Sequence, residues 1–469
     1  MNFDSLESFV LLIATLAAFY GLPRRWRGAV LLAASLAFYG AWSVPFIGLI
    51  VISAGVDYLA GVEIARTAEQ RRRKLWLVLS MATNLAILSF FKYAGFFIDT
   101  LHAFLPEVLP KARGLDVALP AGISFYTFQS MSYTIDVYRR RIAPARSFFD
   151  FFLFVLYFPQ LIAGPIERFG HLMPQLERVD AAKVDRRDVA VALLLIGWGL
   201  VKKMVIADNL AAVVADPYAN PEAHGAAALL AATYAFAFQI FCDFSAYSDI
   251  ARGTALLFGV KLIRNFRLPY LARNPSDFWK RWHVSLSEWI RDYLYIPLGG
   301  NRGGPMRTVF NLFVTMALAG LWHGAAWHYV VWGIYHGLLL GLQRLLAPLL
   351  RPLLGLLPES AADALRIVLT FHLVAIGWVF FRAENVDAAT TILARLLNFE
   401  TWVPIDATAM AFFAAIGCAW LAMGAEGRFR VTHRIASTNF SLGVFLGLCG
   451  AAIAILTPEN GVPFIYFQF

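Results

Sequence analysis

Two histidines between residues 274 and 337 are the side chains whose type and setting point most clearly to chemistry. His283 lies in the stretch RWHVSLSEWIRDYLYIPLGG, beside Trp279 and Trp282. His323 lies in an apolar run long enough to cross a bilayer. An imidazole at membrane depth is costly, so it is a functional candidate by default. Histidine can also accept and return a proton near neutral pH. The sequence therefore predicts proton-transfer or nucleophilic chemistry at this pair.

Other polar residues near the pair are weaker candidates. His336 follows His323 by thirteen residues, so the two share a face only if the helix breaks between them. His328 is expected at a helix end. No metal site is predicted, because neither HExxH nor a carboxylate triad occurs. No GxSxG elbow, Walker loop or dinucleotide fingerprint occurs either. As supporting residues for the pair we expect the following: His336, Trp322, Trp282, Arg281 and Asp243.

The composition is that of a polytopic, all-α membrane protein. Of 469 residues, 59% are hydrophobic and 15% are charged, whereas soluble proteins carry about 25% charged residues. The net charge of +9 does not indicate nucleic-acid binding, because the basic residues cluster between apolar runs as the positive-inside rule requires. The three cysteines have no CxxC spacing and are expected to be buried bystanders.

Apolar segments recur along the whole chain, with no soluble domain between them. A spanning helix needs about 20 residues, and several segments are shorter, so we expect about eleven true spans, with the others re-entrant or tilted. Basic clusters after the first and third segments place the N-terminus on the periplasmic side. The opening MNFDSLES lacks the basic region of a cleaved signal. The candidate spans are 8–22, 28–42, 44–62, 75–97, 148–166, 189–206, 225–241, 248–260, 308–327, 329–345, 367–381, 408–423 and 442–456.

Three stretches do not fit simple spans. Residues 119–141 are apolar but contain Pro120, Gly122 and many hydroxyls, which favours a re-entrant element lining a cavity over an ordinary span. Residues 158–168 have the same character. Residues 276–293 show helical periodicity and predict one amphipathic interfacial helix, with Ser276 as its N-cap, that holds His283 at the edge of a channel. The loop 299–304 is glycine-rich and basic; a flexible turn is favoured over a role in admitting a phosphate-bearing donor.

Several motifs, taken together, resemble one enzyme family. RWHVSLSEWIRDYLYIPLGGNRGG followed by LWHGAAWHYVVWGIYHG is similar to the membrane-bound O-acyltransferase (MBOAT) family, in its bacterial branch that O-acetylates alginate and related polysaccharides. LPAGISFYTFQSMSYTIDVYR, FPQLIAGPIER, DFSAYSDIARG and the closing PFIYFQF are also similar to that branch. The likeness runs essentially from end to end, with the motif order kept.

The resemblance implies a fold and a set of residue roles. It implies a single transmembrane domain over residues 1–469, with the signature region at 265–340 and a ring of helices around a funnel or tunnel. His323 matches the family's catalytic histidine. His283 matches the second signature position, and His336 matches a further histidine of that branch whose role is not assigned.

The resemblance also implies an activity. Members of this branch transfer acetyl from a cytoplasmic donor, which we expect to be acetyl-CoA, across the bacterial inner membrane towards an exported polysaccharide. They work with a periplasmic partner of the SGNH-hydrolase type. No tightly bound cofactor is expected, and the donor-binding residues are not identified. His323 would act either as general base on an acceptor hydroxyl or as a nucleophile giving an acetyl-imidazole, with His283 orienting the donor or stabilising developing charge.

Two other functions stay open at this level. A lipid-linked sugar transporter would carry paired charges along a path and often internal repeats, which we do not find. Transfer of D-alanine to teichoic acid from a carrier protein is a rival within the family. The sequence does not reveal which polymer is modified.

Overall fold

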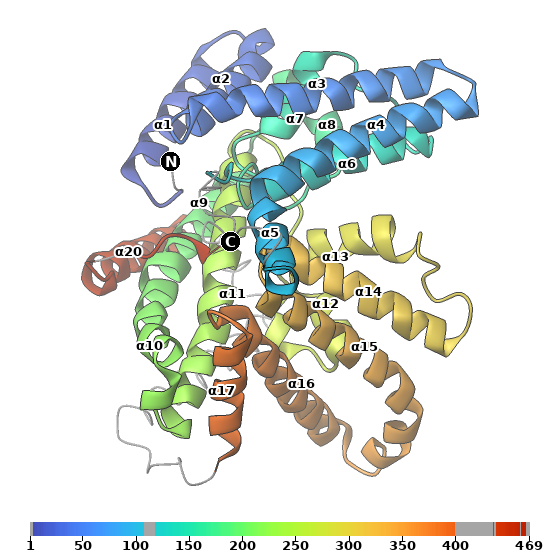
Figure 1. The fold of residues 1–469 in the computed structure, drawn as a ribbon. Helices are drawn as coiled ribbons and strands as arrows, with labels where there is room; N and C mark the ends of the chain where they lie inside the picture. Colours follow the sequence, from blue (N-terminus) through green and yellow to red (C-terminus); the bar gives the residue numbers. More distant parts are fainter. Residues whose placement is uncertain (1–2, 107–117, 399–434, 436–437, 460, 466–469) are drawn as a thin grey trace. The chain divides into compact units, whose positions relative to one another are not determined.

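The computed structural model describes residues 3–106, 118–398, 435, 438–459 and 461–465 (Figure 1). Every regular element in these residues is a helix, which confirms the all-α prediction. The chain forms two compact units, one of Met1–Gly199 with Tyr247–Ile263 and the other of Leu200–Ala246 with Arg264–Phe469. The prediction of a single domain stays a prediction.

The first unit consists mainly of the N-terminal helices. A π-helical segment, Ser89–Tyr93, joins the fourth helix to the fifth. The helices are α1 (Leu6–Gly21), α2 (Arg27–Gly40), α3 (Val44–Arg66), α4 (Gln70–Leu88), α5 (Ala94–Phe104), α6 (Ile123–Tyr138), α7 (Phe148–Leu156), α8 (Phe169–Leu176) and α9 (Arg186–Leu200), the last residue of which begins the second unit.

The second unit contains both predicted catalytic histidines. One long helix, α11 (Ala226–Leu256), contributes residues to each unit. The π-helical segment Val201–Ala207 continues from α9. The other helices of this unit are α10 (Asp208–Ala219), α12 (Pro275–Trp279), α13 (Val284–Ile290), α14 (Pro305–His323), α15 (Trp327–Leu354), α16 (Glu359–Arg382), α17 (Val386–Leu397) and α20 (Asn439–Leu456).

Seven helical stretches of the described chain are long and apolar enough to cross a membrane, as expected of a multi-pass membrane protein. The predicted spans 225–241 and 248–260 are wrong as separate elements, because α11 runs through both without a break. The predicted span 148–166 is also wrong, because α7 ends at Leu156. The predicted span 408–423 lies outside the described residues. The expected total of about eleven spans stays a prediction.

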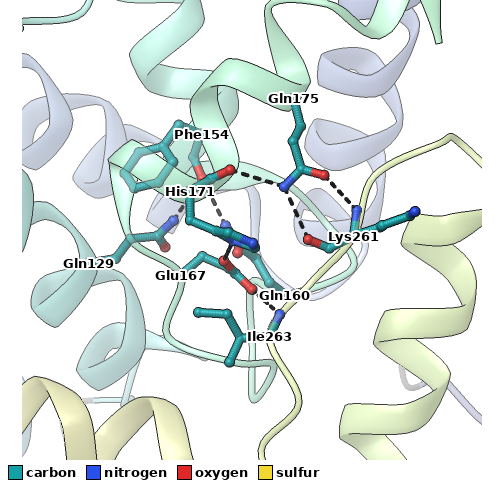
Figure 2. A network of polar contacts seen from close by, with 8 residues as sticks. All are labelled: Gln129, Phe154, Gln160, Glu167, His171, Gln175, Lys261 and Ile263. Carbon is teal, nitrogen blue, oxygen red and sulfur yellow. Dashed lines mark hydrogen bonds and ion pairs between the residues drawn. The ribbon is translucent and has the colours of Figure 1, made fainter.

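The segment predicted as re-entrant, 119–141, contains one continuous helix. Its breakers precede the helix: Gly122 caps α6 with φ 73°, and a Cβ there would lie 2.5 Å from the carbonyl oxygen of Leu161. Twelve of the sixteen residues of α6 are buried. The irregular backbone expected around 158–168 is confirmed up to Arg168, and residues 158–167 are all buried. There Gln160 and Gln129 both donate to the carbonyl oxygen of Phe154 (Figure 2).

A polar clamp holds the end of the first unit (Figure 2). Glu167, His171 and Gln175 are spaced four residues apart and face the extended segment 261–263. The Glu167 carboxylate accepts from the backbone N–H of Ile263 at 2.6 Å and pairs with His171 Nδ1 at 2.6 Å. Gln175 both donates to and accepts from the backbone of Lys261. Glu167 is fully buried and burial raises its pKa, while the hydrogen bond to Glu167 raises the pKa of His171.

Glycines let α14 and α15 pack as a tight antiparallel hairpin. A Cβ on Gly320 would lie 2.1 Å from the carbonyl oxygen of Tyr329, and one on Gly333 would lie 2.1 Å from that of Met316. Only glycine permits so close a backbone approach. The hairpin therefore fixes the end of α14, where His323 lies, against the first turns of α15.

Candidate functional site

The segment around His283 is two short helices, so the single amphipathic helix predicted over 276–293 is wrong. Helix α12 begins after Asn274, whose side chain accepts from the N–H of Asp277 at 2.9 Å, so Asn274 and not Ser276 is the N-cap. The chain then leaves the helix and α13 begins after His283. The periodic residues Phe278 and Trp282 are buried, because this stretch packs into the unit instead of lying on its surface.

His283 has an unusual backbone held by its neighbours. Its φ of 42° and ψ of 57° lie in the left-handed region, which is uncommon for residues other than glycine. Asn265 braces the turn: its carbonyl oxygen accepts from the N–H of Val284 at 3.0 Å, and its side-chain oxygen accepts from that of Ser285 at 3.1 Å. Strained backbone of this kind persists only where the surroundings over-determine it.

The His283 imidazole is completely buried. Its ring lies edge-on to Phe244 with centroids 4.6 Å apart, and 6.1 Å from Trp322. Burial lowers its pKa well below the ordinary value for histidine. A neutral imidazole is therefore favoured, which can accept a proton or a hydrogen bond.

His323 is the last residue of α14. Gly324 caps the helix with extended backbone, and a Cβ there would lie 2.1 Å from the Tyr329 ring. The side chain is buried, with its ring 4.9 Å from that of Trp322 and 5.0 Å from that of Trp332. The predicted catalytic histidine thus sits at a helix end inside an aromatic shell.

The helix breaks between His323 and His336, the condition that the sequence set for the two to share a face, and both rings contact Trp332. Residues 324–326 separate α14 from α15. The His336 ring lies 5.0 Å from that of Trp332 and 5.2 Å from that of Trp279. It is fully buried, and neither ring nitrogen has a hydrogen-bond partner in the described part of the chain.

Two tryptophans thus link all three histidines. Trp322 contacts both His283 and His323, and Trp332 contacts both His323 and His336. The sequence singled out Trp322 but missed Trp332, as well as Trp378 and Phe381 behind it. Trp332 stacks on Trp378 at 6.0 Å and meets Phe381 at 5.2 Å. The sequence feature that could have identified Trp332 is its position four residues before His336, which puts the two on the same face of a helix.

The other predicted supporting residues lie in different settings. Trp282 is buried against Phe278 and Trp378. Arg281 pairs with Asp277 at 2.8 Å and donates to the carbonyl oxygen of Arg267, so its visible contacts brace the backbone before His283. His328 is the second residue of α15, as expected, and its Nδ1 lies 3.0 Å from the carbonyl oxygen of Phe380.

Asp243 belongs to a buried charge cluster that the sequence reasoning only partly anticipated. The sequence offered it as a supporting residue, and in the structure it pairs with Lys203, with 3.0 Å between Lys203 Nζ and Asp243 Oδ1. Lys203 also pairs with Asp208 at 2.8 Å and donates to the carbonyl oxygen of Val462. The other Asp243 oxygen accepts from the N–H of Ile465 at 2.8 Å. The sequence feature that could have indicated this cluster is the pair of lysines at 202–203 within an apolar run.

Chemically, the site offers three imidazoles in surroundings of low polarity, and burial favours the neutral form of His283. Such a surround strengthens hydrogen bonds to developing charge and excludes competing water. Among the described residues, no group of three or more His, Cys, Asp or Glu side chains gathers as metal ligands would. The arrangement suits proton transfer to and from a bound acyl donor and its acceptor. The roles of the individual histidines stay predictions.

Comparison with known proteins gives the family. Residues 112–378 match the model of the membrane-bound O-acyltransferase family. The probable alginate O-acetylase AlgI of Azotobacter vinelandii is 40% identical over 400 residues, which are 85% of this chain and 78% of that protein. The corresponding protein of Pseudomonas putida is 36% identical over 98% of both chains. The peptidoglycan O-acetyltransferase of Helicobacter pylori is 35% identical over 81% of this chain and 74% of its own.

Teichoic acid D-alanyltransferases also match, at 25–30% identity over 52–61% of this chain. They are more distant than the O-acetylases in both identity and coverage. The family model covers more than half of the chain, and the P. putida relative matches nearly all of it. The predicted kinship is therefore confirmed, and this multi-pass membrane acyltransferase belongs to the MBOAT family.

Proposed function

We propose that this protein moves acetyl groups from a cytoplasmic donor, acetyl-CoA, across the bacterial inner membrane for O-acetylation of an exported polysaccharide. The observation that carries the proposal is the convergence of His283, His323 and His336 through Trp322 and Trp332 in one buried aromatic cluster. The O-acetylase relatives, whose similarity covers most of the chain, support acetyl as the group transferred.

The reaction exchanges a thioester for an ester. An acceptor hydroxyl attacks the acetyl carbonyl, the C–S bond breaks, and the hydroxyl proton ends on the departing thiol. His323 takes that proton as general base, which contributes about 10²–10⁴-fold to the rate, and then returns it to the thiolate. His283, held neutral by burial and in ring contact with Trp322, orients the donor. A route through an acetyl-imidazole on His323 differs only in an added covalent step.

We further propose that the acetyl group leaves through a periplasmic partner of the SGNH-hydrolase type, and that the N-terminus faces the periplasm. The basic clusters after the first and third predicted spans support this orientation through the positive-inside rule. Co-purification with such a partner, and cysteine labelling from outside intact cells near residue 3, test these two statements separately.

The decisive experiment measures the release of free CoA from acetyl-CoA and the transfer of labelled acetyl by the purified full-length protein with its partner. His323→Ala should abolish both while leaving the melting temperature near that of the parent. The matched control is His372→Ala, because His372 is a histidine of the same unit whose ring meets Tyr234 instead of the cluster. Normal transfer by His323→Ala would overturn the proposed mechanism.

The same assay separates acetyl from D-alanyl transfer. The protein should release CoA from acetyl-CoA and should not deacylate a D-alanyl carrier protein. The opposite preference would overturn acetyl as the transferred group while leaving the family assignment intact. A lipid-linked sugar transporter would consume neither donor.

A further inference from the structure

A single carboxylate lies buried between three helices of the first unit, whereas the histidine cluster consists of residues of the second. Asp57 is near the middle of α3 and is fully buried. From α4, the Ser80 hydroxyl donates to Asp57 Oδ1 at 2.5 Å. The Asn84 amide nitrogen lies 2.8 and 2.9 Å from the two carboxylate oxygens. Both partners are buried as well.

Further oxygen atoms surround this core. Thr134 of α6 lies 3.1 Å from the Ser80 hydroxyl, and the Ser53 hydroxyl donates to the Asn84 side-chain oxygen at 3.0 Å. Ser130, one turn before Thr134, also faces Asp57. Its hydroxyl is completely buried and adds a hydrogen bond to the carboxylate, so Asp57 has polar neighbours on both α4 and α6.

The charge of Asp57 has no protein partner among the described residues. The ion pairs found there involve other carboxylates, and none includes Asp57. The titratable neighbour on α6 is Tyr133, which is neutral at physiological pH and is hydrogen-bonded to the N–H of Ala145. A lone carboxylate in the middle of a membrane helix needs compensation.

The ligand chemistry selects a small monovalent cation. Carboxylate, hydroxyl and amide oxygens are the donors that hard cations prefer. One carboxylate with neutral oxygens balances a single positive charge, whereas a divalent ion would leave an uncompensated charge inside the membrane. The donors come from three helices, so an ion bound among them would tie those helices together.

We propose that Asp57, Ser80, Ser130 and Thr134 bind a sodium ion that fixes the packing of α3, α4 and α6. The site consists of residues of the first unit alone, and the proposal does not rest on the proposed acetyl transfer. Its role is structural: the ion supplies the positive charge that balances the Asp57 carboxylate.

The test is the melting temperature of the purified full-length protein in detergent, at pH 7.5 and constant ionic strength. Replacing choline chloride by sodium chloride should raise the melting temperature by several degrees, saturably, because a ligand that binds only the folded state stabilises it. Potassium should raise it less. Asp57→Asn should remove the sodium response, and Ser130→Ala should shift its midpoint to about tenfold higher sodium.

The matched control is Ser35→Ala. Ser35 is another fully buried hydroxyl of the first unit, but its partners are the backbone groups of Leu31 and Phe158. This variant should melt lower yet keep the sodium response. The proposal would be overturned if the parent protein did not respond to sodium and its melting temperature rose on acidification, with no such rise in Asp57→Asn. That result would show that Asp57 is protonated. An unchanged sodium response in Ser130→Ala would overturn the assigned ligand set even if Asp57→Asn did not fold.

Discussion

At the scale of single residues, the histidines differ in what their surroundings require. His283 bends the backbone between two short helices, and His323 ends a helix. His336 does neither: it lies within α15, surrounded by rings, with two buried nitrogens that have no hydrogen-bond partner in the described chain. A ring that served packing alone would be better as phenylalanine, because buried polar atoms without partners are destabilising.

His336→Phe should therefore separate stability from activity. We expect the melting temperature to stay the same or rise, because the aromatic contacts with Trp279 and Trp332 remain and two unsatisfied nitrogens disappear. Acetyl transfer should fall by about tenfold or more if the nitrogens meet the substrate. Thermal melting and CoA release on the same preparation give both values. Full activity in the variant would assign His336 to packing.

At the scale of elements, the α14–α15 hairpin depends on close backbone contact. Gly333→Ala should lower the free energy of unfolding by at least about 1–3 kcal/mol, because its Cβ would meet the Met316 carbonyl oxygen at 2.1 Å. The comparison is Gly443→Ala in α20, which meets nothing within 4 Å and should be neutral or slightly stabilising. Chemical denaturation in detergent measures both, and equal effects would contradict the packing argument.

The clamp of Glu167 and His171 should give the first unit a pH-dependent stability (Figure 2). The hydrogen bond to Glu167 raises the pKa of His171 above its ordinary value of 6.5. The stabilisation from the protonated His171 is therefore fully present below pH 6.5, the ordinary pKa of histidine. It is lost as the pH rises through the raised pKa of His171 in the folded protein. The melting temperature should thus fall from about pH 6.5 upwards.

His171→Gln should flatten that dependence. Gln175→Leu is the control, because it removes the contacts with Lys261 without removing a titrating group. It should lower the melting temperature equally at every pH. If His171→Gln keeps the parent's pH profile, the protonated imidazole is not what stabilises the clamp.

At the scale of the whole molecule, Lys203 connects segments far apart in the sequence. It contacts Asp208, Asp243 and the backbone of Val462, and Phe464 places its ring 4.6 Å from the ammonium. The cluster joins α10, α11 and the chain near its C-terminal end within the second unit. Because the two carboxylates share one buried cation, its removal should leave both uncompensated.

Lys203→Met should destabilise the protein by about 3–5 kcal/mol, the usual effect of removing one partner of a buried ion pair. The double variant Lys203→Met with Asp243→Asn should recover part of that loss, because one uncompensated charge is gone. Lys202→Met is the matched neighbour, since Lys202 donates to the Ser245 hydroxyl instead, and its effect should be smaller. Expression level and melting temperature are measured for all three variants. If the loss of stability in the double variant equalled the sum of the losses in the two single variants, Lys203 and Asp243 would not be coupled.

The sequence by itself determined the class of fold, the family and the residues on which chemistry is proposed. Hydropathy suffices for a membrane protein because lipid excludes any spanning structure with unpaired backbone groups, and His323 stands out because imidazole is rare in such surroundings. Only the tertiary structure decided the break at His283, the continuity of α11 and the contact of both His323 and His336 with Trp332. Periodicity cannot reveal these, because each depends on contacts with distant residues: Asn265 braces the turn at His283, and close glycine packing brings α15 back against α14.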